Sequence, residues 1–108
     1  MRRAMLASES LFLDVRGLRY HGRAWGPSDA PPLVLLHGWM DVSASFQFTV
    51  DALRGRHRIL APDWRGYGLT DHAPADSYWF PDYVADLDRL LDLVAPAAPL
   101  HLAGHSMG

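Results

Sequence analysis

The chain of 108 residues contains no cysteine, and all ten of its basic residues are arginine, so lysine is absent as well. Without cysteine, thiolate catalysis, cysteine-ligated zinc and disulfide bridges are excluded. Without lysine, a Schiff-base mechanism and a phosphate-binding loop that ends in lysine are excluded. The formal net charge of −2 lacks the basic excess of a typical nucleic-acid-binding protein, so we expect no nucleic-acid partner.

Long apolar runs are missing too. No window of the sequence approaches the roughly 18 apolar residues of a membrane helix, so no membrane partner is expected. The short apolar stretch at 4–7 is interrupted by polar residues 8–10, well below the roughly 7–15 apolar residues of a signal-peptide core. We therefore expect a soluble, cytoplasmic protein in which residues 1–9 are loosely ordered.

Several short segments have the patterns of β-strands. Apolar and polar residues alternate over 11–15 and 18–24, which predicts a β-hairpin with one solvated face. The glycine and prolines of 26–32 predict a loop after this hairpin. The continuous apolar run at 33–36 is typical of a strand buried on both faces, as in a parallel sheet. Two further short strands are expected, at 57–61 and 100–103.

Two segments have the apolar spacing of helices. Phe46, Val50 and Leu53 recur at helical intervals and predict a helix over 43–53. A longer stripe predicts a second helix, with Pro81 in its first turn and Pro96 at its end. Its members are Tyr83, Val84, Leu87, Leu90, Leu91 and Val94. The acidic residues of 71–92 are interpreted as a solvated helix face, or alternatively as a surface for a cation or a basic partner.

The order of these elements is hairpin, strand, helix, strand, helix, strand. Strands that alternate with helices predict an α/β fold in which parallel strands and crossover helices follow an antiparallel hairpin. In such sheets the reactive groups lie beyond the carboxyl ends of the strands. Three loops are expected at that edge, over 37–42, 63–71 and 104–108.

The last of these loops, G-H-S-M-G at 104–108, matches the G-x-S-x-G nucleophile elbow. Its serine, Ser106, is the candidate catalytic nucleophile, raised on a sharp turn after a strand. Side chains at Gly104 or Gly108 would collide with neighbouring elements, and the backbone N–H of Met107 is expected to point toward a reacting carbonyl oxygen. The alternative is a glycine-rich turn with an inert serine.

The first loop, H-G-W-M at 37–40, supplies the candidate for a second oxyanion donor. Acyl-transfer enzymes need two N–H groups aimed at the developing negative charge, and we expect the second from Trp39. Gly38 allows a close approach of the backbone. His37 is expected to be hydrogen-bonded beneath the sheet, with direct catalysis as the alternative.

The middle loop, D-W-R-G-Y-G-L-T-D, starts at Asp63 and ends at Asp71. Gly66 and Gly68 allow a tight turn in which backbone contacts dominate. Arg65 is expected to hold this loop through carboxylate or carbonyl contacts, and substrate binding is the alternative.

These three motifs, in this order, resemble the N-terminal portion of an α/β-hydrolase fold serine hydrolase. They are most similar to the motifs of the esterase and epoxide-hydrolase-like branch. The resemblance implies that residues 10–108 form an incomplete hydrolase domain ending at the elbow. It also implies a Ser-Asp-His triad and hydrolysis of an ester-like bond in a small-molecule substrate, without a metal or an organic cofactor. Family members that open epoxides or remove halides have aspartate at the elbow, so Ser106 argues against both activities.

In this family the triad acid and the histidine base follow the serine. None of the six histidines of the sequence is at the base position, and the side chain of His105 is expected to point away from Ser106. Asp63 and Asp71 are likewise not expected to be the triad acid. We therefore expect these 108 residues alone to be a poor enzyme, with an open apolar edge at strand 100–103.

Other functions remain open from the sequence. The chain could be a catalytically silent fragment or an interaction protein, a hydrolase of carbon–carbon bonds, or a cofactor-free peroxidase with the same elbow. Trp39, Met40 and Tyr67 are candidates to line part of an apolar substrate pocket, and ordinary packing around the loops is the alternative for each.

Overall fold

The computed structural model describes residues 6–53, 55–94 and 100–108. Its elements are β1 (Glu9–Val15), β2 (Leu18–Trp25), β3 (Pro32–Leu36), the 3₁₀ helix η1 (Ser43–Phe46), α1 (Gln47–Ala52), β4 (Arg58–Pro62), α2 (Phe80–Val94) and β5 (His101–Gly104). The strands form one sheet in the order β1-β2-β4-β3-β5. β1 and β2 pair antiparallel, as do β2 and β4, whereas β3 runs parallel to both β4 and β5. This arrangement confirms the predicted α/β fold class.

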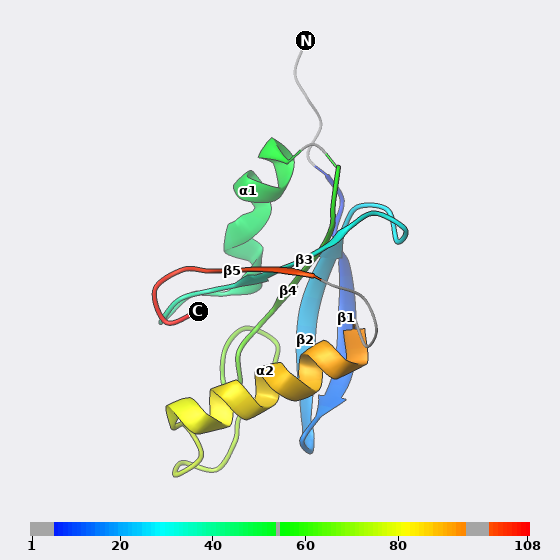
Figure 1. Ribbon diagram of the computed structural model, residues 1–108. Coiled ribbons are helices and arrows are strands. Elements are labelled where there is room, and N and C mark those ends of the chain that lie inside the picture. Colours follow the sequence, from blue (N-terminus) through cyan, green and yellow to red (C-terminus); the bar gives the residue numbers. More distant parts are fainter. Residues whose placement is uncertain (1–5, 54, 95–99) are drawn as a thin grey trace.

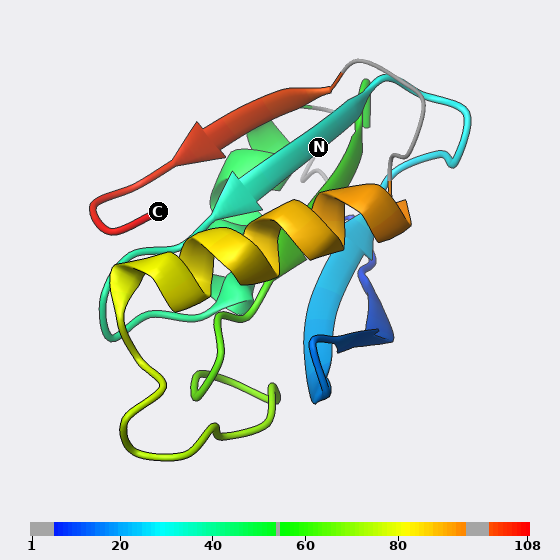
Figure 2. The same ribbon diagram turned by 60° about the horizontal axis from the view of Figure 1, so that its bottom comes forward.

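The two helices lie on opposite faces of the sheet (Figures 1 and 2). The predicted hairpin is confirmed, and its two turn residues, Arg16 and Gly17, both have positive φ, at 52° and 83°. The prediction of one solvated face is wrong for the second strand of the hairpin. Tyr20 and His21 are adjacent residues of β2 that point to opposite faces, and both are buried. Tyr20 packs with Leu90 of α2, and His21 contacts Asp63 and Thr70 of the loop after β4, so each face of β2 is covered at this point.

The helix predicted over 43–53 is an α-helix over only part of its length. Its first four residues form η1, and α1 then continues for six residues. The predicted apolar stripe is confirmed, because Phe46, Val50 and Leu53 pack in one cluster with Trp25 and Leu35 of the sheet. The helix therefore covers the sheet on one face even though its first turn is tightened.

The second predicted helix is confirmed as α2, with Pro81 in its first turn. Tyr83 and Leu90 of its predicted stripe are buried against the sheet. Val84 is 66% exposed, so its place in the stripe was predicted wrongly. Asp86 is fully buried, which contradicts the solvated-face interpretation at that one position. The predicted helix end at Pro96 lies outside the described residues.

The two ends of the described chain differ in their contacts. Of the segment expected to be loose, residues 1–5 lie outside the described residues. The Leu6 N–H donates to the Asp51 carboxylate and its carbonyl accepts from Gln47, so this residue is tied to α1. At the other end, β5 lies at the edge of the sheet, and Leu102 is 49% exposed there. The open apolar edge expected at this strand is therefore present in the structure.

Candidate active site

The turn after β5 holds Ser106 in a strained backbone conformation. Its φ is +59°, in the left-handed region that non-glycine residues rarely adopt. Two hydrogen bonds close the turn: the His105 N–H donates to the Leu36 carbonyl over 3.1 Å, and the Gly108 N–H donates to the His105 carbonyl over 3.1 Å. Ser106 itself is exposed. A strained serine that is exposed on a closed turn after a parallel strand is the geometry of a nucleophile elbow.

Three glycines allow the backbone to pack this tightly. A methyl group at Gly104 would overlap the carbonyl group of Gly108, and one at Gly108 would overlap the carbonyl group of Leu36. A Cβ added at Gly38 would lie 2.9 Å from both the His105 carbonyl oxygen and the Ser106 Cβ. Gly38 thus brings the loop after β3 directly against the elbow.

The two candidate oxyanion donors lie on these adjoining loops. Trp39 follows Gly38, and Met107 follows Ser106. Within residues 6–53, 55–94 and 100–108, neither backbone N–H donates a hydrogen bond to another protein group. Met40, next to Trp39, also has a positive φ of 57°, which turns the loop sharply after the candidate donor. Neither N–H group is thus tied to a protein acceptor in the part of the chain that the structure describes.

His37 is occupied in supporting these loops. It is fully buried, and its Nδ1 lies 2.8 Å from the Gly38 carbonyl oxygen while its Nε2 accepts the Trp64 backbone N–H over 3.0 Å. The Trp64 indole N–H donates in turn to the His37 carbonyl over 3.0 Å. These partners require the ring proton on Nδ1, so both ring nitrogens are engaged and neither is free to deprotonate Ser106.

Asp63 holds the loop after β4 by its carboxylate. One oxygen accepts the Ser43 N–H over 2.7 Å, and the other lies 2.6 Å from His21 Nδ1 and accepts the Leu69 N–H over 3.3 Å. Burial by itself raises the pKa of Asp63, but these hydrogen bonds outweigh burial and hold the pKa below the ordinary aspartate value. Gly68, with φ of +51°, lies so close that a Cβ there would be 2.5 Å from the Asp63 carboxyl carbon.

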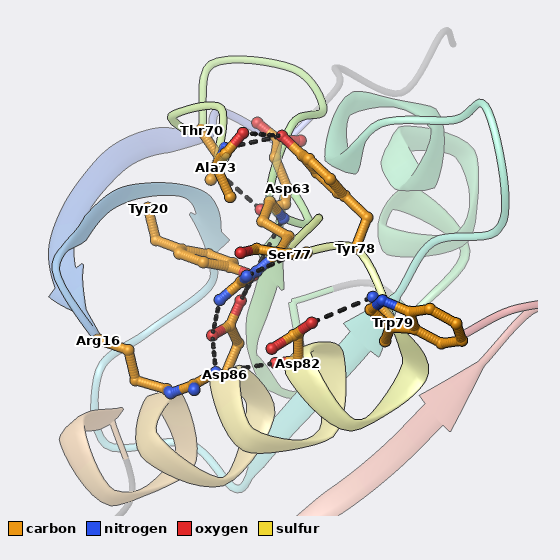
Figure 3. Close-up of polar contacts among 11 residues, drawn as sticks. Arg16, Tyr20, Asp63, Thr70, Ala73, Ser77, Tyr78, Trp79, Asp82 and Asp86 are labelled. Carbon is orange, nitrogen blue, oxygen red and sulfur yellow. Dashed lines mark hydrogen bonds and ion pairs between the residues drawn. The ribbon is translucent and has the colours of Figure 1, made fainter. Parts of the chain in front are cut away.

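Arg65 binds Asp86 of α2 and so joins this loop to the helix. Figure 3 shows Asp86 together with Tyr20 and Arg16, which also bind its carboxylate. The Arg65 guanidinium forms a two-pronged pair with the buried Asp86, with both N–O distances at 2.7 Å, and a third nitrogen donates to the Ser77 carbonyl over 2.6 Å. The Tyr20 hydroxyl donates to the same carboxylate over 2.6 Å and accepts the Arg65 backbone N–H over 3.0 Å. Arg65 thus makes both the carboxylate and the carbonyl contacts that the sequence led us to expect. Hydrogen bonding to Asp86 raises the pKa of Arg65, which stays charged.

Gly66, the remaining glycine of this loop, has a φ of +79° and packs against the Tyr78 ring. Tyr67, the residue after it, contacts two side chains of the first loop. Its ring meets His37 at 5.3 Å and Trp39 at 6.0 Å between centroids, in edge-to-face geometry. The Trp39 side chain is 62% exposed and that of Met40 is 83% exposed. An aromatic row therefore leads from the buried His37 to an open apolar surface beside the elbow.

Sequence reasoning missed two buried residues of this region, Tyr20 and Asp86. Tyr20 could be identified only as an inward-facing strand residue, and Asp86 was placed with the acidic residues of a solvated face. The available signal was the position of Asp86 three residues after Tyr83 in the apolar stripe, which places it on the inward side of α2.

In the described part of the chain, no histidine is hydrogen-bonded to Ser106, and no group of three or more candidate metal ligands is present. Among the described helices, none has the length and apolar character required to cross a bilayer.

The sheet order and the strained serine turn define an α/β hydrolase. Residues 31–108 match the family described as alpha/beta hydrolase fold, and the chain belongs to this family. It is 40% identical over 88 residues to a serine hydrolase-like protein of Danio rerio, covering 81% of this chain and 27% of the relative. It is 36% identical over 104 residues to a cis-3-alkyl-4-alkyloxetan-2-one decarboxylase of Xanthomonas campestris, covering 89% of this chain and 35% of the relative.

Solved structures show the same likeness. An epoxide hydrolase of Vigna radiata superimposes with a TM-score of 0.84 at 30% identity, over 94% of this chain and 33% of that one. A thioesterase domain from the curacin biosynthetic pathway gives 0.82 at 30% identity, over 94% of this chain and 38% of that one. The chain thus spans about a third of these structures, and between 27% and 42% of the serine hydrolase-like proteins of Danio rerio and Homo sapiens.

Proposed function

We propose that the protein is a serine hydrolase that cleaves an ester-like carbonyl substrate, with Ser106 as its nucleophile. The observation that carries this proposal is the positive φ of Ser106 on a turn whose tight packing depends on Gly38, Gly104 and Gly108. Strained backbone conformations of non-glycine residues cluster at active sites, which supports a chemical role for this exposed serine. The similarity to serine hydrolase-like proteins and to a thioesterase domain supports the same chemistry.

The mechanism begins with attack of the Ser106 hydroxyl on the carbonyl carbon. Negative charge then develops on the carbonyl oxygen, and the unengaged N–H groups of Trp39 and Met107 are the donors that stabilise it. A histidine base and an acid must take and return the hydroxyl proton. We place both in the part of the whole protein that follows Ser106, because His37, the histidine of the adjoining loop, is engaged through both ring nitrogens.

Epoxide hydrolases are among the similar structures, but Ser106 disfavours that reaction. A carboxylate that opens an epoxide forms an ester, which water can hydrolyse to free the enzyme. A serine that opened an epoxide would form an ether, which a hydrolase of this kind could not cleave. An acyl group on Ser106, in contrast, forms an ester and can be removed by water. Ester-like substrates are therefore the class that this nucleophile can turn over.

The test compares the natural protein, produced from its complete reading frame, with its Ser106→Ala variant. Substrates are short p-nitrophenyl esters, and kcat/KM is measured for both proteins. We expect the variant to lose activity by on the order of 10³-fold or more, while Ser8→Ala, a change at an exposed serine of the N-terminal segment, has no effect. Equal turnover by the natural protein and the Ser106→Ala variant would remove the assignment.

A β-diketone included in the same substrate panel separates the carbon–carbon hydrolase alternative. Cleavage of the diketone without cleavage of esters would support carbon–carbon bond hydrolysis in place of ester hydrolysis, with Ser106 still the nucleophile. Absence of turnover on every member of the panel by the natural protein would favour a silent or interaction protein.

A further inference from the structure

A second Ser-His-Asp row lies in the hairpin region, separate from the elbow. The Ser10 hydroxyl of β1 is 2.9 Å from Nε2 of His21 on β2, and Nδ1 of His21 is 2.6 Å from the carboxylate of Asp63 after β4. The proposed role of Ser106 uses none of these three side chains in a chemical step. We propose that Ser10 is a second nucleophile, activated by His21 and Asp63, that accepts an acyl group from an activated ester.

The acid end of this row is fixed. Asp63 is only 2% exposed, and hydrogen bonds from Ser43 and Leu69 as well as His21 hold its carboxylate in place. An ionised carboxylate at this distance requires the proton of the neutral ring on Nδ1 of His21. Nε2 then carries the lone pair and accepts the hydroxyl proton of Ser10. This is the arrangement in which an imidazole acts as a general base toward a hydroxyl group.

The strand register places a cation beside Ser10. In the β1–β2 pair, Ser10 lies opposite Arg23 and Phe12 lies opposite His21. Because side chains alternate along a strand, all four share one face of the hairpin, and directly opposed Cβ atoms are about 4.5–5.5 Å apart. Within the described residues, the Nε of Arg23 is buried without a hydrogen-bond partner. The positive charge of Arg23, which lies opposite Ser10 in the register, is what we assign to stabilise the oxyanion that forms when Ser10 attacks a carbonyl.

Access and shielding are divided between the members of the row. Ser10 is exposed, so a reagent can reach its hydroxyl from solvent, whereas His21 is 0% exposed. The Phe12 ring lies 5.1 Å from the His21 ring between centroids, and the Arg19 guanidinium covers Phe12 at 3.9 Å. These groups leave the hydroxyl open while they keep water from the base.

The reaction is a simple acyl transfer. The Ser10 oxygen forms a bond to the carbonyl carbon of the ester, and the hydroxyl proton passes to Nε2 of His21. The bond from that carbon to the leaving oxygen breaks, and the leaving group takes the proton from His21. Asp63 remains ionised and balances the transient charge on the ring. The products are an acyl ester on Ser10 and one alcohol or phenol.

The experiment uses p-nitrophenyl acetate and the protein produced from its complete reading frame with the Ser106→Ala substitution. Acetylation of individual residues is followed in time by peptide mass spectrometry. Residues 1–108 contain no lysine or cysteine to compete for the reagent. We expect Ser10 to be acetylated about 100-fold faster than Ser8, the matched exposed serine two residues away, since general-base assistance typically contributes at least this factor.

A second measurement tests whether the excess reactivity of Ser10 depends on the folded structure. The same labelling is repeated in a concentration of urea that unfolds the protein, where the contact between Ser10 and His21 is broken. We expect the excess reactivity of Ser10 to disappear there, while the rate at Ser8 stays the same. Equal rates at the two serines in the folded protein, or an excess that persists in urea, would overturn the proposal. Because Ser106 is absent from this protein, the result is independent of the proposed esterase function.

Discussion

At the scale of single residues, the elbow is the place where local strain and close packing coincide. A left-handed backbone costs a non-glycine residue about 1–2 kcal/mol, and Ser106 adopts one. Gly104 and Gly108 allow this because no side chain intervenes between the turn and the end of β3. The position of the Ser106 hydroxyl therefore depends on residues that have no chemistry of their own.

Replacing Gly104 with alanine is expected to distort the elbow, because the added methyl group would overlap the carbonyl group of Gly108. We expect a loss of about 1–3 kcal/mol in the free energy of unfolding and at least a 10-fold drop in ester turnover. Gly17→Ala is the control. Gly17 also has a positive φ but has open space around it, so we expect about 1–2 kcal/mol of destabilisation and unchanged turnover. Full activity in the Gly104→Ala variant would show that the turn is not packed as described.

The Asp86 cluster gives a second residue-scale prediction. Asp86→Asn would leave the Arg65 guanidinium, which is only 4% exposed, without its anionic partner. We expect a loss of about 3–5 kcal/mol in the free energy of unfolding, measured by urea titration. Asp88→Asn, an exposed change on the same helix, should alter it by no more than about 0.5 kcal/mol. Similar small effects from both substitutions would contradict the buried ion pair.

Asp63 makes stability depend on pH in a definite direction. Since its pKa is lower in the folded chain than in the unfolded chain, ionised Asp63 stabilises the fold above the ordinary aspartate pKa of about 3.9. This contribution is lost as the pH falls through the lower, folded pKa. We therefore expect the difference in unfolding free energy between the natural protein and Asp63→Asn to shrink from pH 6 toward pH 3 in urea titrations. A difference that stays constant over this range would argue against the assigned hydrogen bonds.

At the scale of elements, hydrophobic periodicity identified the strands and helices because it is a property of neighbouring residues. It placed the apolar side of α1 correctly through Phe46, Val50 and Leu53. It did not show that the first turn there is a 3₁₀ helix, because tertiary contacts fix the turn: the Ser43 N–H donates to Asp63, twenty residues away. Nor could alternation show that β2 is buried on both faces around Tyr20 and His21, since that depends on α2 and on the loop after β4, which are distant in sequence.

The exposed edge at β5 leads to a prediction for the 108-residue polypeptide produced by itself. We expect it to self-associate, because β5 offers unpaired backbone groups and an apolar side chain at Leu102. Leu102→Lys should reduce this association, measured by light scattering over a range of concentrations. Phe48→Lys, which removes a more exposed apolar side chain from α1 rather than from a strand edge, should not. An equal reduction of self-association by both variants would indicate nonspecific hydrophobic association rather than pairing of strand edges.

At the scale of the whole molecule, the candidate site could be predicted where it rests on motifs and could not where it rests on distant contacts. The glycines around Ser106 belong to a short pattern, and the sheet topology then carries three loops to one edge. Asp86 meets Tyr20 across 66 residues of sequence, and His21 meets Asp63 across 42. Local sequence patterns do not predict contacts between residues so far apart in the chain. These buried polar pairs were therefore identified only from the structure.

Trapping of the nucleophile with a fluorophosphonate tests the central claim, that the turn after β5 presents a reactive serine. The natural protein from its complete reading frame is inhibited to completion, digested, and examined by mass spectrometry for the phosphonylated residue. We expect the phosphonyl group on Ser106, and we expect loss of ester turnover to follow the modification of that residue in time. Complete inhibition with the peptide containing Ser106 unmodified would contradict the assignment.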